Sequence, residues 1–134
     1  MSLTEVRSPR FRQGDATRRS VLGDAHVERV EAATTELDAP FQALITEAAW
    51  GHLWSREEWS KRERSIVTIA LLAALGHYDE MAMHIRATAR TGASEADIRE
   101  ALLHVAIYAG VPTANNAFRI AKQVYAEMRG GGEP

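Results

Sequence analysis

A nearly uninterrupted apolar run extends from Ile66 to Leu75 and limits the folds that the chain can adopt. Wound as a helix, this run is apolar on every side, so other helices must enclose it. A chain of 134 residues is expected to build one domain, which supplies few helices to cover another all round. We therefore expect part of this helix to be buried against other subunits, and the chain to form a homo-oligomer.

Apolar residues recur at helical spacing through most of the chain, and no stretch alternates between apolar and polar residues as a strand would. Ser60 with Glu63, and Ser94 with Asp97, have the spacing of capping boxes that begin helices. The pattern predicts an all-α fold of about six helices. They are expected over Asp24–Leu37, from Asp38, from Ser60 to Gly76, over Asp79–Thr91, from Ser94 to Ala109 with Pro112 as a stop signal, and from about Thr113.

The two ends of the chain lack this periodicity. Residues 1–17 carry Pro9, Gly14 and scattered charges, so we expect a flexible N-terminal arm. Residues 18–129 are expected to form a single helical domain. The sequence Gly-Gly-Gly-Glu-Pro at residues 130–134 predicts a disordered tail.

The composition excludes several classes of chemistry. The chain has no cysteine, which excludes disulfides, thiolate metal sites, iron–sulfur clusters and thiol nucleophiles. A net charge of -2, and N-terminal arginines without interleaved aromatic residues, argue against a nucleic-acid partner. No stretch approaches the length of a membrane span, and the first residues lack the apolar run of a signal peptide. We expect a cytoplasmic protein without a membrane partner.

Glu80 and His84 form one candidate site. They lie four residues apart on a predicted helix, so their side chains are neighbours that can share a proton. An ordinary exposed Glu–His pair, which stabilises a helix by about 0.2–0.5 kcal/mol, has the same spacing. A metal site can also be drawn from His77, Glu80 and His84, but nothing in the sequence fixes its remaining ligand, so we expect no metal.

Glu100, His104 and Tyr108 form a second ridge, on the next predicted helix, at the same four-residue spacing. A histidine beside an apolar stripe also fits a purely structural role. Only the convergence of both ridges on one pocket would decide in favour of catalysis, and spacing does not show convergence.

Arg64 and the tryptophans are candidates for binding. Arg64 lies in the first turn of the apolar helix, where an unpaired guanidinium would be costly to bury. Its partner could be a protein carboxylate, or a bound dicarboxylate held in a bidentate fork. Trp50, Trp54 and Trp59 fit the core or an interface as well as the wall of a ligand site.

Five blocks of the sequence carry a pattern between about Gly14 and Met128. They are Val21-Leu-Gly-Asp-Ala-His-Val27, Trp50-Gly with Trp54, Arg64-Ser-Ile-Val-Thr-Ile-Ala-Leu-Leu-Ala-Ala-Leu-Gly76, Glu80-Met-Ala-Met-His84 and His104-Val-Ala-Ile-Tyr-Ala-Gly-Val-Pro112. Together they resemble the carboxymuconolactone decarboxylase family, within the alkyl hydroperoxidase D-like superfamily.

Other members of that superfamily use a Cys-x-x-Cys-x-x-x-His motif for thiol redox chemistry. When the motif's histidine is aligned on His84, His77 and Glu80 stand in place of the two cysteines, so that activity is excluded here. The family that the chain resembles commonly has a cysteine where this chain has Ala109. Either decarboxylation does not need a thiol at that position, which we favour, or this copy is impaired.

The resemblance implies a helical homotrimer or homohexamer that acts on a small lactone dicarboxylate. The implied reaction is cofactor-free decarboxylation of 4-carboxymuconolactone to 3-oxoadipate enol-lactone and carbon dioxide, in the protocatechuate branch of aromatic degradation. Two alternatives remain: a relative acting on another unsaturated lactone or keto acid, and a non-catalytic oligomeric binding protein.

The resemblance also implies roles for individual residues. His84, polarised by Glu80, would donate a proton, and His104 would donate to a developing oxyanion, with these two histidine roles exchangeable. The substrate-binding residues would be Arg64, which grips a carboxylate, Trp54, which walls the pocket, and Tyr108, which lies near His104.

Overall fold

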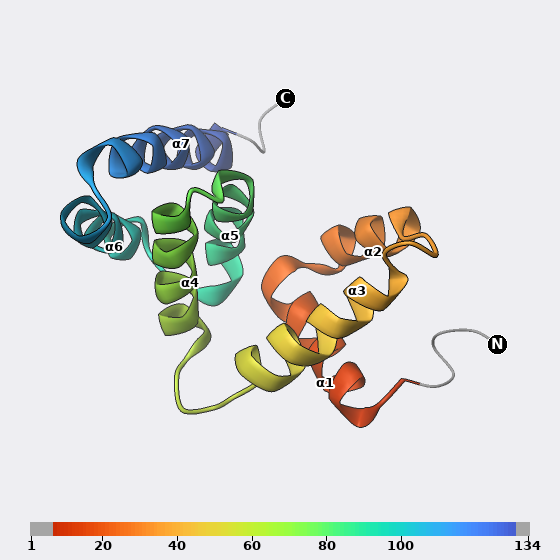
Figure 1. The fold of residues 1–134 in the computed structure, drawn as a ribbon. Coiled ribbons are helices and arrows are strands. Elements are labelled where there is room, and N and C mark those ends of the chain that lie inside the picture. The colour runs from red at the N-terminus through yellow and green to blue at the C-terminus, as the bar shows by residue number, and fades with distance from the viewer. Residues whose placement is uncertain (1–6, 131–134) are drawn as a thin grey trace. The chain divides into compact units, whose positions relative to one another are not determined.

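The computed structural model describes residues 7–130, and these residues form helices without any strand (Figure 1). The all-α prediction is therefore confirmed. The chain divides into two compact units, residues 1–59 and 60–134, where the sequence pattern predicted one domain. Each unit is described by itself. The elements are α1 (Pro9–Leu22), α2 (Asp24–Ala33), α3 (Ala39–Ile45), the π-helix η2 (Thr46–Trp54), α4 (Lys61–Leu75), α5 (Tyr78–Thr91), α6 (Glu95–Tyr108) and α7 (Val111–Gly130).

Most of the predicted N-terminal arm is helical. Helix α1 begins at Pro9, a residue suited to the first helical turn, and the Ser8 hydroxyl caps it by accepting a hydrogen bond from the Phe11 amide at 3.0 Å. The sequence pattern missed this helix because α1 does not bury a regular apolar stripe. Residues 1–6 of the predicted arm, and 131–134 of the predicted tail, lie outside the described residues.

Helix α1 packs against η2 through glycines. A Cβ atom on Gly14 would collide with the carbonyl oxygen of Thr46, and one on Gly51 would lie 2.5 Å from the carbonyl oxygen of Arg10. Helix α3 continues into η2, where the backbone winds more widely over Thr46–Trp54. The absence of two side chains thus allows the helix backbones to touch.

We expect Gly14→Ala to destabilise the N-terminal unit by about 3 kcal/mol, because the added methyl group forces α1 away from η2. Urea unfolding followed by tryptophan fluorescence measures this change, since all three tryptophans lie in residues 1–59. The control is Gln13→Ala, an exposed position on the same helix, which should change stability by less than about 0.5 kcal/mol. Equal stability of the two variants would contradict the close approach.

Helices α4 to α7 enclose the core of the C-terminal unit (Figure 1). Both predicted capping boxes are present, at Ser60 with Glu63 and at Ser94 with Asp97. A hydrogen bond from Arg62 on α4 lowers the pKa of Asp97 on α6 to about 2. The fully buried large side chains of this core are Ile69, Met81, Ile85, Ile98 and Leu102.

Some helix boundaries differ from the prediction. Helix α2 ends at Ala33, and the Asp38 carboxylate accepts a hydrogen bond from the Thr35 amide instead of capping α3. Helix α7 begins at Val111, so Pro112 lies inside its first turn, where proline is tolerated, rather than marking a stop. No helix of the described chain is long and apolar enough to cross a membrane.

Candidate active site

His84 lies on the buried side of α5. Its side chain is 6% exposed, and Met81, Ile85 and Thr88 on the same helix are buried with it. These residues follow the spacing of an amphipathic helix, which explains why the sequence places His84 at the edge of the apolar core. A histidine in this position is poorly solvated, so its hydrogen bonds are stronger than they would be in water.

Glu80 does not contact His84 in the described part of the single chain. It lies in the exposed first turn of α5 and forms no hydrogen bond or ion pair with any described residue. The predicted spacing is present, but the direct Glu–His hydrogen bond is not formed. Polarisation of His84 by Glu80 stays a prediction for the assembled protein.

Arg64 is buried in the first turn of α4, with its side chain 9% exposed. The connection between α4 and α5 is only Gly76 and His77, so the two helices run antiparallel. Their register is marked by the Ser65 hydroxyl, which donates a hydrogen bond of 2.7 Å to Thr91 Oγ1. Because Thr91 lies about two helical turns after His84, Arg64 and His84 are separated by about 10 Å along this helix pair.

His104 and Tyr108 lie on α6 and stack on one another. Their ring centroids are 6.3 Å apart, and the ring planes differ by 14°. Both side chains are exposed, Tyr108 by 86%, and their interactions with other described residues are limited to this stack. Glu100 of the same predicted ridge accepts a hydrogen bond from its neighbour Arg99 instead of contacting His104.

Apolar side chains close in sequence to this exposed pair are exposed as well. They are Leu103, Ile107 and Val111, along α6 and at the start of α7, and Ile107 is 76% exposed. Isolated exposed apolar residues are common, whereas a contiguous apolar surface indicates a binding interface. His104 and Tyr108 therefore lie on an exposed, partly apolar surface of the kind that binds another protein surface.

Trp54, the remaining predicted binding residue, lies at the end of η2 in the N-terminal unit. Its side chain is 4% exposed and packs against Trp50 with ring centroids 5.0 Å apart. This burial fits the core or interface position that the sequence pattern left open, and the place of Trp54 in the wall of a ligand site stays a prediction.

Buried hydroxyl groups lie near the α4–α5 pair, and the sequence pattern carries no signal for Ser65 among them. Ser65 is fully buried, and the Tyr125 hydroxyl of α7 has its pKa raised by burial. Small hydroxyl residues in an apolar helix give no periodic signal, so only the packed structure identifies them. Across residues 7–130, no group of three or more histidine, aspartate or glutamate side chains gathers as a metal site would require.

Comparison with known proteins connects these residues to a chemistry. The Carboxymuconolactone decarboxylase family matches residues 39–123, more than half of the chain. The chain belongs to this family. Its matched region begins at α3 and includes every residue predicted above for catalysis or substrate binding, and the resemblance inferred from the sequence is confirmed.

Three relatives extend beyond the family match. A 4-carboxymuconolactone decarboxylase of Acinetobacter baylyi is 40% identical over 89% of this chain and 89% of its own length. The nitrosuccinic acid decarboxylase npaB of Metarhizium robertsii is 35% identical over 92% of this chain and 86% of its own length. An uncharacterized 15.0 kDa protein of Paracoccus denitrificans is 28% identical over 71% of this chain and 72% of its own length. Two of these three relatives are thus named as decarboxylases.

Proposed function

We propose that the chain is a carboxy-lyase that converts 4-carboxymuconolactone to 3-oxoadipate enol-lactone and carbon dioxide. The observation that carries this proposal is the 40% identity, over 89% of both chains, with a protein named for that activity. The family match over residues 39–123 supports decarboxylation independently of that single relative.

The substrate supplies its own electron sink. Its departing carboxylate is attached to a ring carbon that is linked through the ring double bond to the lactone carbonyl. When the carbon–carbon bond to the carboxylate breaks, its electron pair moves through the ring onto the carbonyl oxygen, and carbon dioxide leaves. A proton then adds to the ring carbon next to the carbonyl, which regenerates the lactone. The reaction needs stabilisation of an oxyanion and one proton transfer, which side chains can provide.

We assign these tasks to the residues of the C-terminal unit. His84 donates the proton from its poorly solvated position on α5, and His104, next to Tyr108, donates a hydrogen bond to the oxyanion. Arg64 holds a carboxylate through its bidentate fork. The separation of about 10 Å between Arg64 and His84 along the helix pair supports contacts with opposite ends of one substrate.

We further propose that a second copy of the chain completes the site in a homo-oligomer, either the trimer or the hexamer that the family resemblance implies. Val67, Leu71 and Leu75 form an exposed apolar ridge on α4, with Leu71 56% exposed. Exposed apolar residues also lie on α6 near Tyr108, and apolar surfaces of this kind are typical of protein–protein interfaces. The cytoplasmic location expected from the sequence stays a prediction.

The oligomer can be tested with Leu71→Glu, which should lower the mass measured by light scattering at micromolar concentration. The substitution puts a charge into an apolar interface, where it is costly to bury, but leaves the chain's own core intact. Gln123→Glu, an exposed position on α7, is the matched control and should keep the mass of the original protein. A protein that is already monomeric, or a Leu71→Glu variant of unchanged mass, would contradict the proposed interface.

A second candidate substrate follows from the relative named nitrosuccinic acid decarboxylase. In nitrosuccinate the nitro group can accept the electron pair that carbon dioxide leaves behind, so the two substrates share their chemical logic. Carbon dioxide release from both compounds should be measured side by side as kcat/KM. We expect the lactone to be preferred at least tenfold. A preference for nitrosuccinate would show that the protein is a decarboxylase with a different substrate from the one proposed. If neither compound released carbon dioxide, a non-catalytic binding protein would be favoured.

A further inference from the structure

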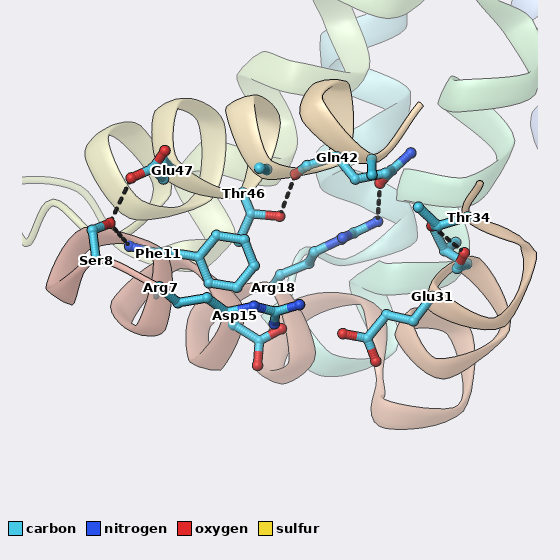
Figure 2. Close-up of a pocket in the computed structure, with 13 residues that line it drawn as sticks. Arg7, Ser8, Phe11, Asp15, Arg18, Glu31, Thr34, Gln42, Thr46 and Glu47 are labelled. Atoms are coloured by element: carbon cyan, nitrogen blue, oxygen red, sulfur yellow. Dashed lines mark hydrogen bonds between the residues drawn. The ribbon is translucent and has the colours of Figure 1, made fainter. Parts of the chain in front are cut away.

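A cavity of about 540 Å³ lies within the N-terminal unit, between α1, α2, α3 and η2 (Figure 2). The decarboxylation chemistry proposed above makes no use of it. Apolar side chains line part of its wall, including Phe11, Val30 and Ala43, and the volume suits a small organic molecule. The figure shows Arg18 extending across the cavity from α1 toward Gln42.

Arg18 is unusual for a charged residue in that its side chain is only 7% exposed. Its one hydrogen bond with the described residues runs from an Nη atom to the Gln42 amide oxygen, at a long 3.4 Å, and its Nε is buried without a partner. Arg18 also forms no ion pair with a described carboxylate. A guanidinium has five N–H donors, so most of its hydrogen-bonding capacity is not used by the protein.

The carboxylates beside the cavity are occupied by other groups. Asp15 and Glu31 pair with Arg19, at 3.1 and 3.0 Å, and Glu47 accepts a hydrogen bond from the Ser8 hydroxyl. Burial lowers the pKa of the Arg18 guanidinium, and the charges of Asp15 and Glu31 oppose this effect without cancelling it. The cavity therefore contains a buried cation whose charge the protein compensates incompletely.

We propose that this cavity binds the carboxylate of a small organic acid, with Arg18 as the anion-binding group and the apolar wall against the hydrocarbon part of the ligand. A planar carboxylate matches the guanidinium fork. The three acidic residues around the cavity disfavour a doubly charged phosphate, because it would be repelled more strongly than a single carboxylate. The occupant is either the substrate's own carboxylate or a separate acid.

Isothermal titration of the full chain with benzoate and with hexanoate tests the site, with inorganic phosphate as the comparison anion. We expect saturable binding of at least one of the two acids, and binding of that acid should weaken about tenfold or more in Arg18→Gln. Ala43→Leu should weaken it as well, because the larger side chain fills the cavity while leaving Arg18 in place. Arg29→Gln, an exposed position on α2, is the control and should bind as the original protein does.

Ala43→Leu also keeps the test decisive if Arg18→Gln does not fold. Absence of saturable binding to either acid, or equal affinity in the original protein and in Ala43→Leu, would overturn the proposal, as would tighter binding of phosphate. Competition between the bound acid and the lactone, with a raised KM in Arg18→Gln, would identify the substrate's carboxylate as the occupant. Binding without competition would identify a separate acid. These titrations do not depend on turnover, so they remain interpretable even if the proposed decarboxylation is not observed.

Discussion

Replacement of His84 by alanine is expected to lower kcat for decarboxylation about a hundredfold or more, with a smaller change in KM. His84 is the buried imidazole of the C-terminal unit, and loss of a general acid usually costs about 10²–10⁴ in rate. An effect concentrated in kcat is expected because proton transfer contributes to the transition state more than to binding of the substrate. Steady-state carbon dioxide release by purified protein measures both constants.

His77→Ala is the matched control for this experiment. His77 lies in the turn before α5 and its side chain is exposed. We expect its kcat to stay within about threefold of the original value, because a surface substitution outside the site rarely alters function. If His84→Ala kept the original kcat while remaining folded by circular dichroism, His84 would lose the role of proton donor.

Replacement of Arg64 by glutamine is expected to lower kcat/KM about a hundredfold, mainly through a higher KM. A charge-assisted bidentate contact is among the strongest hydrogen-bonding arrangements in proteins, and glutamine cannot reproduce its charge. Arg64→Lys keeps the charge but not the planar fork, so we expect a loss of about tenfold. The measurement is the dependence of the initial rate on lactone concentration.

Because Arg64 is buried, its substitution could also act through stability, and the lysine variant separates the two effects. Thermal unfolding of Arg64→Lys should resemble that of the original protein while its KM is raised. Arg90→Gln removes an exposed arginine near the end of α5 and should leave KM unchanged. A KM for Arg64→Gln equal to that of the Arg90→Gln control would show that Arg64 does not hold the substrate.

Helices with an apolar stripe could be predicted from the sequence, and those without one could not. The capping boxes at Ser60 and Ser94 gave correct starts for α4 and α6, since capping depends on residues three apart. Helix α1 was missed because its packing depends on the absence of a side chain at Gly14, which resembles a loop signal in sequence. The boundary between the two compact units has no signal in the sequence, because the residues around Trp59 lack a composition typical of linkers.

Helical spacing also predicted only part of the candidate site, because it shows which side of a helix is buried but not what that side contacts. Spacing correctly suggested that His84 borders the apolar core, because burial follows helical periodicity. It also suggested a Glu80–His84 pair, but Glu80 lies in an exposed turn and makes no such contact within the described chain. Which helix faces meet depends on tertiary and quaternary packing, and helical spacing along one segment does not determine either.

We expect the chain's own side chains to suffice for decarboxylation of 4-carboxymuconolactone. Its most direct test is carbon dioxide release from this lactone by purified protein that has been treated with a chelator and dialysed. We predict release far above the spontaneous rate, with one carbon dioxide formed for each enol-lactone. Release no faster than in buffer, or activity that returns only when a metal or cofactor is added back, would contradict it.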